Sequence, residues 1–121
     1  MYELSVERNF DAAHAITMAG EREASHRHNW QVKVIVAGQQ LDTDGLLCDF
    51  HRLESALADV LAPFDGGDLN AIAPFDQLNP TAEHVARYIA QRMSESLPQG
   101  VAVKCVSVTE APGCCATYLE K

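Results

Sequence analysis

The stretch NWQVKVIVAG, residues 29–38, decides the fold class. It is rich in β-branched residues and ends at Gly38, which is typical of a strand. Upstream, residues 2–10 alternate apolar and polar side chains, and this period of two predicts another strand with one face toward water. If the two strands pair as a hairpin, they form the first half of a sheet.

The rest of the chain predicts two helices and then two more strands. Apolar residues recur at helical spacing from residue 49 to the proline at 63, and again over residues 79–96, where Asn-Pro begins the helix. Residues 62–78, rich in Gly, Pro, Asp and Asn, predict a long ordered loop. Residues 101–110 and 115–119 predict strands. The order β-β-α-α-β-β indicates an α+β protein with a four-stranded antiparallel sheet and both helices on one face.

Composition bounds the function. The 121 residues carry 9 Lys and Arg against 17 Asp and Glu, a net charge of −8, which argues against nucleic acid but not against a small anionic ligand. No apolar run approaches the roughly 18 residues of a membrane span, and the N-terminus lacks the layout of a signal peptide. We expect one domain over residues 1–121, in the cytoplasm, with no membrane partner.

The four cysteines have no Cys-x-x-Cys spacing. A cytosolic chain keeps such thiols reduced. We therefore expect Cys48, Cys105, Cys114 and Cys115 to be small buried apolar residues.

Three histidines suggest a metal site. His26 and His28 are two residues apart at the entrance to the second strand, so their imidazoles share a face. His14 directly follows the first strand and can reach the same place if the strands pair. Three neutral imidazoles with an open fourth position suit a catalytic zinc ion. The alternative, that these histidines are solvated or satisfied in the core, stays open at this point.

Six short motifs occur in a fixed order over nearly the whole chain. They are Phe10-Asp11-Ala12-Ala13-His14, His26-Arg27-His28, Asp49-Phe50, Asp65 with Leu69-Asn70, Asn79-Pro80-Thr81-Ala82-Glu83, and Thr109-Glu110. Together they resemble the 6-pyruvoyl-tetrahydropterin synthase / 6-carboxy-tetrahydropterin synthase family. The resemblance implies a T-fold whose subunits join through their sheets into a barrel of trimers, usually a homo-hexamer built as a dimer of trimers, with active sites between subunits.

The resemblance also implies roles for particular residues. His14, His26 and His28 match the family's three Zn²⁺ ligands. Glu110 matches the glutamate that holds the amino-pyrimidine edge of a pterin substrate, an edge that suits a carboxylate accepting two parallel hydrogen bonds. Thr81 lies where the family places a residue close to the pterin, although helix capping explains a threonine there almost as well.

The sequence departs from the family's pattern in three places. Arg27 replaces the glycine of the usual His-Gly-His; we expect it to point to solvent, the alternative being contact with a substrate phosphate. The usual cysteine before these histidines is missing, but Glu21 stands five residues before His26, with Glu23 nearby. This resembles the family branch in which glutamate replaces cysteine and the product is 6-hydroxymethyl-dihydropterin.

The third departure concerns the acid–base relay. Asp65 is retained, but Gly66 replaces its histidine partner. His51 and His84 are possible replacements, although histidines at such positions are more often only helix-surface residues.

These observations predict a zinc-dependent lyase acting on a dihydroneopterin (triphosphate) derivative in pterin, folate or deazapurine (queuosine) biosynthesis. Its candidate acid–base residues are Glu21, Glu23 and Asp65. The alternative is a pterin-binding zinc T-fold protein without the classical synthase activity, and a third reading has no metal at all.

Overall fold

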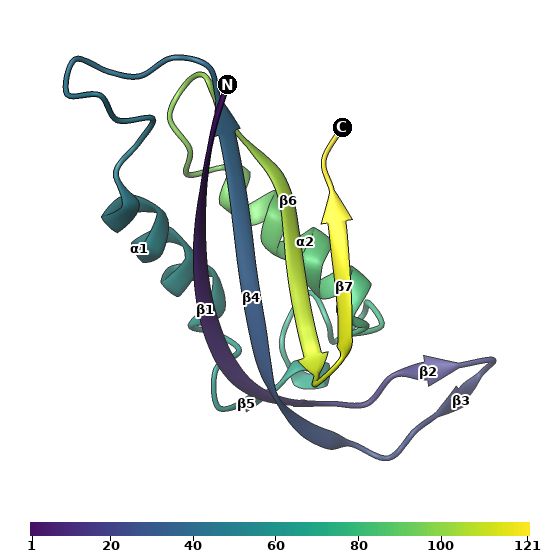
Figure 1. Cartoon of the computed structure of the whole chain (residues 1–121). Helices are drawn as coiled ribbons and strands as arrows, with labels where there is room; N and C mark the ends of the chain where they lie inside the picture. Colours follow the sequence, from purple (N-terminus) through teal and green to yellow (C-terminus); the bar gives the residue numbers. More distant parts are fainter.

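Two long strands form the centre of the sheet in the computed structural model, which describes residues 1–121 (Figure 1). β1 spans Tyr2–His14 and β4 spans His26–Gly38, and they pair antiparallel from Tyr2 opposite Gly38 to His14 opposite His26. Each strand is 13 residues long, more than the predicted 2–10 and 29–38, because the pairing continues past the apolar stretches. The extension includes all three candidate metal ligands.

The remaining strands complete a five-stranded sheet in the order β5-β1-β4-β6-β7. β6 (Val101–Ala111) and β7 (Cys114–Leu119) are antiparallel additions, whereas β5 (Gly67–Asp68) pairs parallel to β1. The predicted α+β T-fold class is confirmed, but the main sheet has one short strand more than the four predicted, since β5 forms inside the expected loop 62–78. A separate hairpin of β2 (Thr17–Met18) and β3 (Glu21–Arg22) projects beyond the sheet (Figure 1).

Both helices cover one face of the sheet, as predicted (Figure 1). α1 (Phe50–Leu61) begins at its N-cap Asp49 and packs on β1. α2 (Ala82–Ser94) packs on β6 and β7. A 3₁₀ turn, η1 (Leu69–Ala71), lies between them in sequence. Neither helix has the length and apolar character needed to cross a bilayer.

The core lies between the sheet and the helices. Val34 of β4, Leu57 of α1 and Ile89 of α2 are each at most 1% exposed. The alternation along β4 explains this layer, because every second side chain faces the helices. No helix covers the other face of the sheet. That face carries polar side chains such as the hydrogen-bonded hydroxyls of Ser107 and Thr117.

The expectation for the cysteines is half right. All four thiols are free, and Cys48 and Cys105 are buried. Cys114 and Cys115 are exposed, so the prediction is wrong for them. They lie at the start of β7, an edge strand that directly follows a turn and pairs with a neighbouring strand, β6, on one side only.

Candidate metal centre and ligand pocket

Strand pairing brings three imidazoles together. His14 is directly opposite His26 in the β1–β4 register, and His28 is two residues further along β4. The ring centroids of these three residues, here called the histidine cluster, lie 4.4–5.3 Å apart. His14 is fully buried, whereas His26 and His28 are partly exposed. The cluster therefore has one closed side and one side open to a ligand.

Backbone carbonyls fix the protonation of two of the rings. Nδ1 of His14 lies 2.8 Å from the carbonyl oxygen of Pro80, and Nδ1 of His26 lies 3.2 Å from that of Ala24. A carbonyl oxygen only accepts, so each Nδ1 carries the hydrogen and a neutral ring presents Nε2 as a bare lone pair. The two Nε2 atoms are 3.1 Å apart. A proton or a metal ion between or beside the rings relieves the repulsion between these lone pairs.

Nε2 of His28 is the third imidazole nitrogen of the group. This atom is buried and makes no hydrogen bond. Burial lowers the pKa of His28; the Glu110 carboxylate opposes this shift, and the rings of His26 and His14 add to it. The ring is therefore neutral at pH 7, the form in which imidazole binds metal ions.

Glu110 joins the histidine cluster from the far end of the sequence. Its Oε1 lies 2.8 Å from Nε2 of His14, 3.1 Å from Nε2 of His28 and 3.7 Å from Nε2 of His26. The four ligand atoms all lie within 4.8 Å of one another. Ligands in a tetrahedral zinc site are about 3.3 Å apart, given metal–ligand bonds of about 2.0–2.1 Å.

A proton and a metal ion differ in how many of these four atoms they provide with a partner. A proton on His14 would let that ring donate to Glu110, but it would leave Nε2 of His28 without a partner. A metal ion provides a partner for every nitrogen at once. The donor set thus fits a metal ion, and His14, His26, His28 and Glu110 form a group that can hold one.

The ring of Trp30 packs against the histidine cluster. Sequence analysis did not identify this residue. It is fully buried, and its Nε1 donates to the carbonyl of Ala12 over 3.1 Å. Its ring lies edge-on to His14, with centroids 4.7 Å apart. The available signal was its place two residues after His28, on the same face of the strand.

The structure distinguishes the two candidate glutamates. Oε1 of Glu23 accepts a hydrogen bond from the backbone N–H of Ile16 (3.1 Å) and lies 3.7 Å from Nδ1 of His26. Glu21 is exposed on β3, in the projecting hairpin, and makes no contact with the histidine cluster. Within one chain, only Glu23 contacts a ring of the cluster, and it does so at Nδ1 of His26 rather than at the converging Nε2 atoms.

Asp65 is not brought to the cluster. It is exposed, and its Oδ1 accepts a hydrogen bond from the backbone N–H of Asp11 over 2.9 Å. Thr81 acts as the N-cap of α2, where its hydroxyl accepts from the N–H of His84. Nδ1 of His84 donates to the carbonyl of Asn79. His51 is 92% exposed beside Asp49, so neither spare histidine reaches the cluster.

Two asparagines from the quoted motifs, Asn70 and Asn79, hold the chain just after His14, a role that sequence analysis did not assign to them. The side-chain amide of Asn70 bonds both the N–H and the carbonyl of Ala15, at 2.7 and 2.9 Å. Asn79 does the same for Thr17, with both bonds at 2.9 Å. Each side-chain amide bonds the backbone N–H and carbonyl of one residue, as a paired strand would. The sequence pattern does not predict such long-range hydrogen bonds.

A pocket of about 450 Å³ adjoins the cluster. We call it the Glu110 pocket; it is lined by Arg27, His28, Asn29, Gln31, Thr109, Glu110, Ala111, Pro112 and Gly113. Its volume is in the range of about 300–1,000 Å³ found for small-molecule sites. Arg27 points to the helix-free face, as predicted, and its Nη1 lies 3.1 Å from Oδ2 of Asp11.

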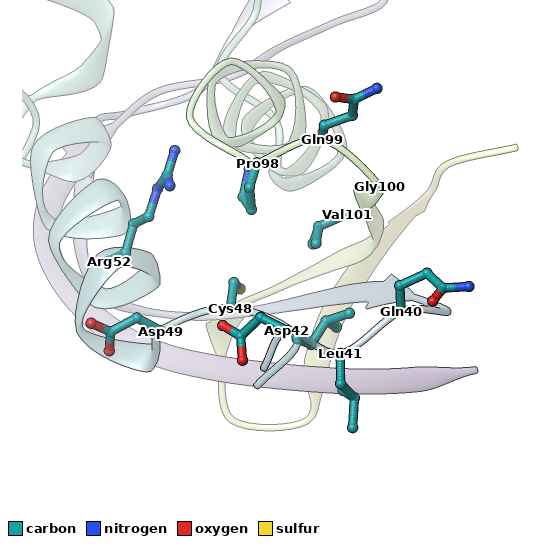
Figure 2. A pocket seen from close by; sticks show the side chains of 11 residues that line it. Gln40, Leu41, Asp42, Cys48, Asp49, Arg52, Pro98, Gln99, Gly100 and Val101 are labelled. Carbon is teal, nitrogen blue, oxygen red and sulfur yellow. The ribbon is translucent and has the colours of Figure 1, made fainter. Parts of the chain in front are cut away.

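A second hollow, of about 430 Å³, lies near the start of α1 (Figure 2). Its charged groups already serve the local backbone: Arg52 donates to the carbonyl of Ser96, Asp49 accepts from the N–H of His51, and Asp42 accepts from the N–H groups of Asp44 and Leu46. It offers no comparable cluster of metal-binding groups. The Glu110 pocket is therefore the candidate ligand site.

Two relatives match most of the chain. A dihydroneopterin monophosphate aldolase of Pyrococcus furiosus is 34% identical over 102 residues, covering 84% of this chain and 83% of that protein. An Archaeoglobus fulgidus protein provisionally named a 6-carboxy-5,6,7,8-tetrahydropterin synthase is 30% identical over 108 residues, covering 88% and 86%.

Solved structures show the same fold. The Caenorhabditis elegans 6-pyruvoyl tetrahydropterin synthase matches with a TM-score of 0.83 at 24% identity, covering 100% of this chain and 98% of that one. A Plasmodium vivax 6-pyruvoyltetrahydropterin synthase, in a variant whose replaced catalytic residue is a glutamate, matches at 0.79 and 21% identity, covering 99% and 98%. The sequence pattern of 6-pyruvoyl tetrahydropterin synthase matches residues 3–121. The chain belongs to the 6-pyruvoyl tetrahydropterin synthase family.

Proposed function

We propose that this protein, as a single domain over residues 1–121, is a zinc-dependent lyase that cleaves the side chain of a phosphorylated dihydroneopterin. The observation that carries the proposal is the convergence of three imidazole nitrogens and the Glu110 carboxylate beside a pocket of small-molecule size. The 34% identical relative is named a dihydroneopterin monophosphate aldolase, which supports an aldol cleavage.

His14, His26 and His28 hold the zinc ion in this proposal. Bound zinc lowers the pKa of the substrate's side-chain hydroxyls. Glu110, with Thr81, holds the pterin. The Oε1 atom of Glu110 lies among the imidazoles, so Glu110 could bind either the pterin or the metal ion. A test must separate these two roles.

Glu23 is our choice of general base in preference to Glu21, because only Glu23 lies next to the histidine cluster. The base takes the proton of the 2′-hydroxyl, and the bond between C1′ and C2′ breaks. Its electron pair passes into the pterin ring, and C1′ then takes a proton. The products are 6-hydroxymethyl-dihydropterin and a two-carbon aldehyde that keeps the phosphate, so atoms and charge balance.

Within its own chain, Asp65 accepts a hydrogen bond from Asp11 and does not reach the histidine cluster. Asp65 can therefore act as an acid or base only at the site of a second subunit. We propose a homo-hexamer built as a dimer of trimers. The uncovered polar face of the sheet and the open edge of β7 support this assembly, because unpaired edges tend to be covered. The four free thiols suit a cytoplasmic enzyme.

Two alternatives remain candidates, each with its own observation. A 6-carboxy-tetrahydropterin synthase activity, which serves deazapurine (queuosine) synthesis, is supported by the provisional name of the 30% identical relative. A pterin-binding protein without classical synthase activity is supported by Gly66, where the expected relay histidine is absent, and by the distance of His51 and His84 from the cluster.

The deciding experiment incubates the zinc-loaded protein with dihydroneopterin monophosphate or triphosphate, with and without a chelator, and identifies products by mass spectrometry. A 6-hydroxymethyl product whose formation the chelator prevents supports the proposed aldolase activity. A 6-carboxy product supports the synthase, and unchanged substrate in a protein that still binds pterin supports the binding-protein alternative.

A further inference from the structure

We propose that Arg27 recognises the phosphate of the substrate and makes the site selective for a phosphate monoester. The inference rests on the proposed function, because it takes a pterin to be the ligand of the Glu110 pocket. Its observations are the position of Arg27, the charges that line the pocket, and the gap between β4 and β6.

The gap gives the pocket access to both faces of the sheet. β6 stops pairing with β4 where Thr109 lies opposite Gln31, so residues 26–30 of β4 have no strand partner on that side. The pocket occupies this place. His28 and Glu110 line it from the side of the histidine cluster, whereas Arg27 lies between two metal-site histidines in sequence but on the opposite face of the strand.

Arg27 is the only cationic side chain among the lining residues. Its side chain is 50% exposed, and its guanidinium makes one hydrogen bond, to Asp11, its diagonal neighbour across the β1–β4 pair. A guanidinium has five N–H donors in a planar fork, so at least four remain to bind phosphate oxygens. The Asp11 carboxylate orients the fork without covering it.

The charges at the pocket favour a monophosphate over a triphosphate. A phosphate monoester carries about −1.5 to −2 at neutral pH, of which the single positive charge of an arginine offsets about half to two-thirds. Within one subunit, the two further phosphates of a triphosphate find no other cationic side chain among the lining residues, in a chain with a net charge of −8. We therefore expect the monophosphate to bind at least as tightly as the triphosphate.

The test measures equilibrium binding, without turnover, of three oxidised fluorescent analogues: neopterin, neopterin monophosphate and neopterin triphosphate. Arg27→Gln should weaken monophosphate binding by about ten- to hundredfold, as expected for losing a charged hydrogen-bonded pair, and leave neopterin binding unchanged. Asp11→Asn should strengthen monophosphate binding by about two- to fivefold, because it removes a competing anion. Arg8→Gln, a charge-matched control outside the pocket, should change neither.

Equal effects of Arg27→Gln on all three ligands, or no effect on any, would overturn the assignment. So would a wild-type preference for the triphosphate. If phosphate selectivity is found but the zinc-loaded protein leaves dihydroneopterin monophosphate intact, the role of Arg27 stands and the proposed reaction fails.

Discussion

Nε2 of His14 lies 3.1 Å from Nε2 of His26, and both rings have their Nδ1 hydrogen directed at a backbone carbonyl. The strand register places the rings opposite each other, and the carbonyls of Pro80 and Ala24 select the tautomers. Two lone pairs so close repel each other, and a proton or a metal ion relieves this repulsion. A binding site is therefore prepared by the backbone before any ligand arrives.

Removing one ring tests the metal site. His28→Ala should lower zinc affinity by more than about 100-fold, because it deletes a direct ligand and even outer partners are worth about 10–100-fold. Elemental analysis after dialysis measures the bound zinc. His51→Ala, at a side chain that is 92% exposed, is the matched control and should stay loaded. A fully loaded His28→Ala protein would refute the ligand set.

The two possible roles of Glu110 give opposite results for Glu110→Gln. If the carboxylate holds the pterin, zinc content stays the same and neopterin affinity falls by about ten- to hundredfold, since a neutral amide accepts less strongly from the pterin N–H groups. Fluorescence titration and elemental analysis on the same sample separate the roles. Loss of zinc with unchanged pterin affinity would make Glu110 a metal ligand instead.

Glu23 and Glu21 form a matched pair for the base. Glu23→Gln keeps the oxygen that accepts from Ile16 but removes the basic carboxylate, so kcat should fall by about 10²–10⁴-fold with zinc content unchanged. Glu21→Gln should leave kcat within about twofold. The reverse order of effects would restore Glu21, which lies farther along the hairpin, as the base in the assembled enzyme.

Trp30→Phe tests the support beneath the cluster. The change leaves the Ala12 carbonyl without its indole donor and should lower the free energy of unfolding by about 1–3 kcal/mol. Urea unfolding of the chelator-treated protein measures this loss. Tyr2→Phe, at an exposed site, should change stability by less than about 0.5 kcal/mol. Equal stability of both variants would show that the indole bond contributes nothing.

Thiol reactivity should follow burial and pH. Burial raises the pKa of the Cys48 thiol, an effect that Arg52 opposes and Asp49 reinforces. A raised pKa lowers the thiolate fraction at any given pH below it, so Cys48 should need more alkaline solution to react than a free thiol does. Peptide mapping after iodoacetamide treatment at pH 7–9 should find Cys114 and Cys115 modified first. Faster reaction at Cys48 would contradict the burial.

Local pattern was enough for most of the fold. The alternation over residues 2–10, the apolar run 29–38 and the two helical periods are properties of neighbouring residues, and they gave the element order and the shared face of His26 and His28. Long-range pairing decided what lay outside these windows. β5 exists only because Gly67 and Asp68 lie beside Ala12 and Ala13, a contact that no local period encodes.

For the site too, local sequence determined some features and long-range packing decided the others. The sequence by itself determined that the two histidines of His-x-His share a face, because a strand repeats every two residues, and its motifs identified the family. Only the tertiary structure decided that Glu110, 96 residues from His14, reaches the same point, and that Glu23 rather than Glu21 lies beside His26. These positions depend on strand register and on the bulge in β6 near Ala111, which are set by packing across the whole sheet rather than by neighbouring residues.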